Sequence, residues 1–127
     1  MAAGPIDSLI YAHNAIRSEA GALVEALGHA SSPQAAGELA PRIVFLHEFL
    51  RMHQEGEEKG LFPVLAEAFP HVPDTYLFDH EHERAATEEL VALATACASG
   101  DVAALAALQH ALPIFAAAVA AHSRKED

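Results

Sequence analysis

The most informative stretch of the sequence runs from Met52 to Pro63 and reads MHQEGEEKGLFP. In it His53 is followed four residues later by Glu57. On an α-helix, side chains at this spacing lie one above the other on the same face. An imidazole and a carboxylate placed in this way are able to bind one metal ion together or to bridge two. Surface helices also carry such pairs by chance, so a single pair is weak evidence for a metal site.

The pair does recur, and a second pair, histidine followed four residues later by arginine, also occurs twice. In chain order the four pairs are His13/Arg17, His53/Glu57, His80/Arg84 and His122/Glu126. This alternating order indicates an internal duplication, with one half over about residues 1–70 and the other over 71–127. Two pairs of helices, each offering a histidine and a histidine–glutamate pair, are able to enclose two metal ions.

Length and composition suit a single domain over residues 1–127, of which 52% are hydrophobic. The long apolar segment 102–121 is interrupted by Gln109, His110 and Pro113, so we expect a buried helix there and no membrane span. The single cysteine, Cys97, suits a reducing compartment, and no basic leader with a cleavage site begins the chain. We therefore expect a cytoplasmic protein.

The charge balance disfavours two classes of partner. The chain has 7 Lys and Arg against 18 Asp and Glu, a net charge of −11 with histidine neutral. Such a surface repels nucleic acid and anionic lipid, and with 6% aromatic residues and no tryptophan we see no platform on which bases could stack. We therefore expect neither nucleic acid nor membrane as a partner.

Apolar residues recur at spacings of three and four over four segments, which predicts four helices. A loop at 31–37 with a short helical turn separates the first two. The expected helices are about 5–28, 41–69 with a kink or break at Pro63, 74–97 with Asp74 or Thr75 as N-cap, and 101–127 with Asp101 as cap and a kink at Pro113.

In each expected helix the apolar residues form a line along one face. Each of these apolar lines contains one histidine, and two lines also carry a glutamate one turn after the histidine. Burying ionisable groups is costly unless they are paired or bind a metal. A single histidine on an apolar face is most often a hydrogen-bonded core residue, but four of them with two carboxylates at matched spacing indicate a metal site. The candidate ligands are His13, His53, Glu57, His80, His122 and Glu126.

Three further expectations follow from the same lines. His82 is an alternative to His80, but the position of His80 on the apolar line favours His80. The second line continues from Glu57 through Leu61 and Val64, which should therefore face the core. The histidines off the lines, which we expect on the surface, are His29, His47, His71, His82 and His110.

Taken together, these residues resemble the hemerythrin-like domains of the HHE cation-binding family over the whole chain. The resemblance rests on His13-Asn14-Ala15-Ile16-Arg17, the block from His53 to Pro63, Asp79-His80-x3-Arg84 and His122-x3-Glu126-Asp127. It implies an all-α fold, an up-down-up-down antiparallel four-helix bundle around two non-haem iron ions with an oxo or hydroxo bridge. It also implies that the four histidines are terminal ligands, and that Glu57 and Glu126 bridge the irons. The ligand types also suit manganese or zinc.

The sequence departs from the oxygen-carrying hemerythrins in two places. Those proteins have a second histidine where this chain has Arg84, so one iron would need water, oxide or another side chain, and Tyr76 is a candidate neighbour. Glu126 is followed by one residue only, although the motif is commonly followed by more helix. We therefore expect a domain cut from a longer chain, with a fused or partner output domain as a further expectation.

Three functions are compatible with the sequence. The first is a di-iron domain that binds or senses O2, iron or redox state, with O2, H2O2 or NO as small-molecule partners. The second is a di-iron enzyme that acts on peroxide or NO, for which an open coordination position is suitable. The third is a metal-free helical interaction module.

Overall fold

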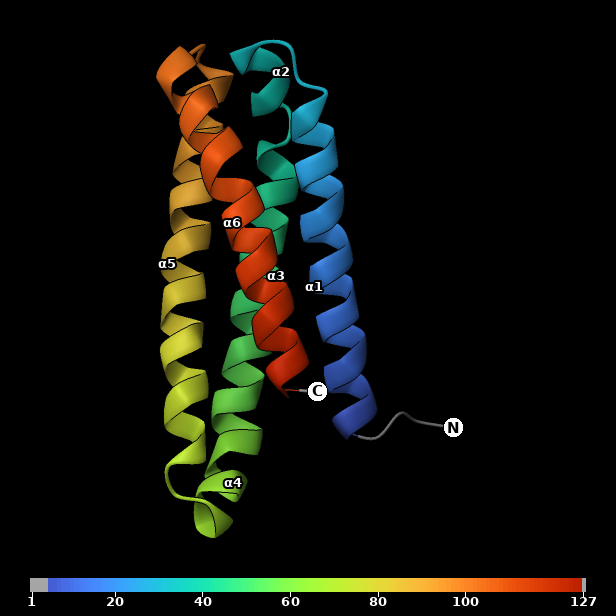
Figure 1. Cartoon of the computed structure of the whole chain (residues 1–127), viewed down its shortest axis with the longest axis vertical. Coiled ribbons are helices and arrows are strands. Elements are labelled where there is room, and N and C mark those ends of the chain that lie inside the picture. Colours follow the sequence, from blue (N-terminus) through green and yellow to red (C-terminus); the bar gives the residue numbers. More distant parts are fainter. Residues whose placement is uncertain (1–4, 127) are drawn as a thin grey trace.

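The computed structural model describes the backbone of residues 5–126 and the side chains of residues 11–125. Within this range all regular elements are helices. The long helices are α1 (Pro5–Gly28), α3 (Ala40–Gly56), α5 (Val72–Ala98) and α6 (Val102–Glu126), and the short ones are α2 (Pro33–Gly37), the π-helix η1 (Glu57–Leu61) and α4 (Phe62–Ala68). The long helices lie side by side, with α2 and the α5–α6 connection at one end and α4 at the other (Figure 1). The chain is therefore an all-helical bundle, as its periodicity predicted.

Most helix boundaries follow local signals in the sequence. The short turn expected in the loop is α2, whose N-cap Ser32 accepts a hydrogen bond from the backbone N–H of Ala35 at 3.1 Å. Asp101 caps α6 as expected, because its Oδ1 accepts from the N–H of Ala104 at 3.1 Å. The caps expected for α5 are wrong: the helix already begins at Val72, with a proline in its first turn, where the missing N–H costs nothing.

One apolar core is built from the inward faces of α1, α2, α3, α5 and α6. α5 packs against α3 and α6, and α1 packs against the same two helices. At the end where α2 lies, Gly37 sits directly on α5: a Cβ added there would be 2.4 Å from the Cα of Ala98. The buried members of the core include Ile16, Leu23, Leu27, Ile43, Leu46, Leu50, Leu90, Leu108, Leu112, Phe115 and Val119.

Helix α6 is apolar enough to invite a second interpretation. By length and composition alone, its segment Val102–Lys125 could cross a membrane, since its mean hydropathy is 1.8. A core helix passes the same test, and the stripe that includes Leu108, Leu112 and Phe115 is buried against the rest of the bundle. Only 28% of that apolar window is buried, so the expectation of a buried helix holds for this one stripe and not for the rest of α6.

The predicted second helix is interrupted by a π-helical turn between α3 and α4. The N–H of Phe62 bonds to the carbonyl of Glu57, five residues back, and Pro63, which has no N–H, begins the first turn of α4. The wider turn shifts the buried face by one residue, so that Phe62 is 4% exposed. The expectation that Leu61 and Val64 face the core is therefore wrong; they are 37% and 63% exposed.

Candidate metal centre

Three of the predicted ligands meet inside the bundle. His13 of α1, His53 of α3 and Glu57 of η1 offer ligand atoms that all lie within 4.8 Å of one another. The rings of the two histidines meet edge to face, with centroids 4.9 Å apart. His53 Nε2 lies 2.9 Å from Glu57 Oε1. One turn of α3 and the start of the π-helix therefore place these two groups beside the imidazole of α1.

The donors around Glu57 suit a cation. The glutamate is 5% exposed, and neither of its carboxylate oxygens has a hydrogen-bond partner among the described residues. The same is true of His53 Nε2, because its short contact to Glu57 lacks hydrogen-bond geometry. Buried polar atoms left in this state cost about 1–3 kcal/mol each. Two imidazoles and a carboxylate are ligands that iron, manganese and zinc accept, so the residues present fit a metal ion.

The second pair of predicted histidines lies next to this cluster. His80 of α5 is completely buried, and its Nε2 is 3.4 Å from Glu57 Oε1. The ring of His80 meets the ring of His122, which lies on α6, edge to face, with centroids 5.2 Å apart. One carboxylate oxygen of Glu57 therefore lies between an imidazole of α3 and an imidazole of α5.

Two carboxylates outside the cluster orient the imidazoles of the second pair. Glu58 Oε2 lies 2.9 Å from His80 Nδ1, and Asp79 Oδ2 lies 2.9 Å from His122 Nδ1. If each Nδ1 carries the proton and donates it to its carboxylate, the lone pair is on Nε2, the nitrogen suited to a metal. Such outer carboxylates fix the ring orientation of metal-binding histidines and raise their basicity.

Two cations support these carboxylates. Arg84 Nη2 is 3.5 Å from Glu58 Oε2, and Lys125 Nζ is 2.6 Å from Asp79 Oδ2. Burial raises the pKa of Asp79, but the hydrogen bonds from Lys125 and His122 outweigh burial and leave this pKa below its ordinary value. Arg84, which stands where the oxygen carriers have a second histidine, thus acts on Glu58 in this structure.

The sequence did not single out a buried polar pair beside the cluster. Gln54, next to His53, is 0% exposed, and its Nε2 donates to Glu83 Oε1 at 2.8 Å. Glu83 is 5% exposed and lies one turn after His80 on the same face of α5. Helical spacing puts Glu83 on the same face as His80, but pattern along α5 gives no reason to expect its partner on α3.

The remaining histidines largely follow expectation. His82 is exposed, so the structure places His80, rather than its alternative, inside the bundle. His47 is the exception among the histidines expected on the surface, because it is half-buried and its Nδ1 lies 2.6 Å from the hydroxyl of Thr87. The side chain of Glu126, the sixth candidate ligand, lies outside the described residues, although the backbone of α6 includes this position.

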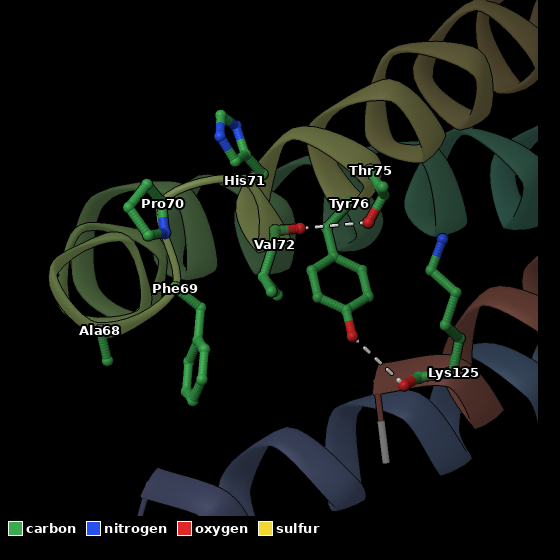
Figure 2. Close-up of a pocket in the computed structure, with 8 residues that line it drawn as sticks. All are labelled: Ala68, Phe69, Pro70, His71, Val72, Thr75, Tyr76 and Lys125. Carbon is green, nitrogen blue, oxygen red and sulfur yellow. Dashed lines mark hydrogen bonds between the residues drawn. The ribbon is translucent and has the colours of Figure 1, made fainter.

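Aromatic side chains cover His80 and His122 on the side of α4. Phe62 stacks on His80 with centroids 5.3 Å apart, and Tyr76 meets His122 edge to face at 6.0 Å. The Tyr76 hydroxyl makes a long hydrogen bond of 3.4 Å to the carbonyl of Lys125, and beyond it lies a hollow of about 710 Å³ (Figure 2). The hydroxyl of Tyr76 is thus engaged with the last turn of α6, and the same side chain both lines this hollow and contacts the ring of His122.

Comparison with known proteins identifies the family. The chain matches the family described as the hemerythrin HHE cation binding domain over residues 4–127. No curated protein and no solved structure matches the chain. The match spans essentially the whole chain, and the cluster of His13, His53 and Glu57 is a donor set for the cation that the family description names. The chain therefore belongs to the hemerythrin HHE cation-binding family.

Proposed function

We propose that the chain is a non-haem di-iron domain that binds or senses O2, iron or redox state. In this proposal the bundle has the up-down-up-down antiparallel arrangement of hemerythrins. His13 and His53 would hold one iron and His80 and His122 the other, and Glu57 and Glu126 would supply the carboxylates shared by the two. When bound, an iron pair supplies redox chemistry toward O2, peroxide or NO. The observation that carries the proposal is the buried Glu57 carboxylate between His53 and His80.

The side chains of the chain have distinct tasks in this proposal. The imidazoles supply neutral nitrogen donors, and Glu57 supplies negative charge that offsets the charge of the metals. Glu58 and Asp79 hold the rings of His80 and His122 in position. The surrounding helices and the ring of Phe62, which is 4% exposed, limit the access of water to His80.

The proposal is tested by adding ferrous iron anaerobically to the full chain, and then measuring bound iron and the thermal melting curve. We expect about two irons per chain, by analogy with two-metal carboxylate sites in helical bundles, and a rise in melting temperature. Glu57→Gln should lose most of both effects, because a neutral amide is a poor bridging group. Glu55→Gln is the matched control, because Glu55 pairs with Arg51 at the surface of the same helix.

An unchanged melting curve and no bound iron in the wild type would reject the metal centre. Equal iron binding by Glu57→Gln and by the wild type would reject the role of Glu57. A loss of iron in Glu57→Gln is assigned to Glu57 only if the Glu55→Gln control binds iron like the wild type, since this shows that the loss of one carboxylate from this segment is not itself damaging.

A second candidate function, an enzyme acting on peroxide or NO, is favoured by one contact. Arg84 pairs with Glu58. Among the described residues, α5 therefore offers only one buried histidine, His80, as a nitrogen donor to the centre. A coordination position open to a small molecule is what a reactive metal site needs. Peroxide decay with iron-loaded protein tests this function, and turnover no faster than that of free iron would reject it.

A further inference from the structure

The outward side of α6 carries no charge over most of its length. The helix packs mainly against α5 and α1, and its remaining side faces away from the bundle (Figure 1). With histidine neutral, residues 102–121 contain no charged side chain, although the whole chain has a net charge of −11. Most of the apolar window in this helix is not buried. A large exposed apolar patch commonly marks an interaction site, so this side of α6 is a candidate docking surface.

The exposed residues on this side form a regular line along the helix. Positions separated alternately by four and three residues are those that meet a partner when two helices pair along their length. Four of the six such positions are alanines, whose small side chains allow two helix axes to approach closely. Ile114, near the middle of the line, is large and 57% exposed. The six exposed residues, which we call the α6 seam, are Ala103, Ala107, His110, Ile114, Ala117 and Ala121.

The surface next to Ile114 is hollowed. A groove of about 390 Å³ lies between α5 and α6, and Ile114 is part of its lining. Pockets of about 300 Å³ and more accept drug-sized molecules, so a four-carbon side chain fits into this groove. The same face therefore offers a projecting isoleucine and a hollow for one, which makes it complementary to a second copy of itself. The lining includes the apolar Leu90, Ala111, Phe115 and Ala118, and also the carboxylates of Glu83 and Glu89.

The charges at the two ends of the α6 seam favour an antiparallel pair. Asp101 lies just before α6 and Arg124 in its last turn, and both are exposed. In an antiparallel pair centred on Ile114, Arg124 of one copy comes within three residues, or about 4.5 Å along the axis, of Asp101 of the other. A parallel pair would place the two Arg124 side chains together and align the two helix dipoles, which is less favourable.

We propose that the chain forms a symmetric dimer in which the α6 seams of two copies pair antiparallel, with Ile114 of each copy seated in the groove of the other. Twenty helical residues give a strip about 30 Å long and about 10 Å wide, or roughly 300 Å² per copy. A standard interface has about 800 Å² per partner, so this dimer is of the weak class, with a Kd in the micromolar range or above. The pairing does not depend on the metal centre.

The dimer is tested by analytical ultracentrifugation of the metal-free full chain over a range of concentrations up to the millimolar level. Ile114→Glu places two carboxylates at the two-fold axis, and Ala117→Glu, one turn further on, is a second variant of the same seam. Phe45→Glu is the matched control, because Phe45 is 64% exposed but lies on α3. Circular dichroism checks that each variant is folded.

We expect a concentration-dependent dimer in the wild type and in Phe45→Glu. Ile114→Glu and Ala117→Glu should each raise the Kd at least about tenfold, because an unpaired charge would be buried in the interface. A wild type that stays monomeric at all concentrations would overturn the dimer. Loss of the dimer in Phe45→Glu, with a wild-type Kd in both seam variants, would overturn the assignment to α6 and place the interface on α3.

The orientation of the two helices is tested with cysteines in the metal-free protein. Ala107 and Ala121 lie seven residues before and after Ile114, and the native Cys97 is fully buried. On mild oxidation, a mixture of Ala107→Cys and Ala121→Cys should give a mixed disulfide. Either variant alone should not link to itself, because equivalent positions would be about 21 Å apart along the axis and a disulfide needs Cα atoms within about 7 Å. Self-linking of each variant alone would overturn the antiparallel arrangement.

A lipid surface is the other partner that an uncharged helix face is able to bind. Helices that lie on membranes usually insert Trp, Phe or Leu, whereas the α6 seam has Ile114 as its one large apolar side chain. We therefore expect the wild type not to sediment with phosphatidylcholine vesicles. Vesicle binding that Ile114→Glu abolishes, by a wild type that is monomeric in solution, would overturn the dimer and assign the face to lipid.

Discussion

Two adjacent carboxylates, Glu57 and Glu58, contact the same imidazole from opposite sides of its ring. Glu57 Oε1 is 3.4 Å from His80 Nε2, and Glu58 Oε2 is 2.9 Å from His80 Nδ1. Their surroundings separate their roles. Glu57 is buried among imidazoles, whereas Glu58 is partly exposed and also contacts Arg84. We infer that Glu57 faces the metal and that Glu58 sets the orientation of His80.

This division of roles predicts different effects of two similar substitutions. Glu58→Gln should keep the iron stoichiometry of the wild type but lower the iron affinity by about 10–100-fold, the usual cost of removing an outer partner of a metal-binding histidine. Glu57→Gln should lower the stoichiometry itself. Competition against a chelator of known affinity measures the first effect, and metal analysis measures the second. Unchanged affinity in Glu58→Gln would show that the contact to His80 does not matter.

At the level of the elements, the π-helical turn begins at Glu57, the residue that α-helical spacing from His53 already places beside His80. In a continuous α-helix the N–H of residue 63 would bond to the carbonyl of Lys59, a bond that proline is unable to make. The chain instead forms the bond from Phe62 to Glu57 and begins a new helix at Phe62. Such π turns are frequent at functional sites.

Pro63→Ala should therefore favour an uninterrupted α-helix and weaken the site. We expect the backbone ¹³C shifts of residues 57–62 to move toward α-helical values, and the iron affinity to fall about tenfold as Glu58 leaves His80. Pro113→Ala, which changes the proline inside α6, is the control and should leave iron affinity unchanged. Retention of the π-type hydrogen bonds in Pro63→Ala would show that the proline does not cause the turn.

The contact between α2 and α5 makes a second prediction at this scale. Gly37→Ala should destabilise the fold by about 1–3 kcal/mol, because its new methyl group would meet the backbone of Ala98 at 2.4 Å. Gly21→Ala, in the interior of α1 with nothing within 4 Å of the added carbon, should stabilise it by about 0.5–1 kcal/mol. Urea unfolding measures both. Equal free energies for the two variants would contradict the close approach of α2 to α5.

The comparison between sequence and structure is clearest for these same elements. Periodicity predicted the long helices and placed His13 and His80 on buried faces, because within one helix spacing alone determines which residues share a face. It predicted Leu61 and Val64 wrongly, because the π turn adds a residue that no α-helical period includes.

Contacts between helices were the other part that the sequence could not supply. The pairing of Asp79 with His122, and of Gln54 with Glu83, depends on how α5 is rotated against its neighbours. Asp79 was part of the motif around His80, but its partner lies on α6. A pattern along one helix therefore finds the groups that face the centre more readily than the groups that hold them there.

At the scale of the whole molecule, the proposed centre connects all four long helices. His13, His53, His80 and His122 come one each from α1, α3, α5 and α6. The first two lie in the N-terminal half of the chain and the last two in the C-terminal half, and Glu57 lies between His53 and His80. A metal pair at this position would hold the two halves together, because the separation of either half would break metal–ligand bonds.

Metal binding to this centre should be coupled to the stability of the whole bundle. A ligand that binds only the folded state at 100 times its Kd raises the free energy of unfolding by about 2.7 kcal/mol, and the rise grows with the logarithm of free metal. We therefore expect the melting temperature to increase steadily with ferrous iron, to return to the metal-free value with a chelator, and to change little in Glu57→Gln. Amide hydrogen exchange should slow around His13 in α1 and His122 in α6, which belong to different halves. Slowing around His13 and His53 alone would contradict a shared centre, because the metal would then stabilise only the half that supplies those two residues.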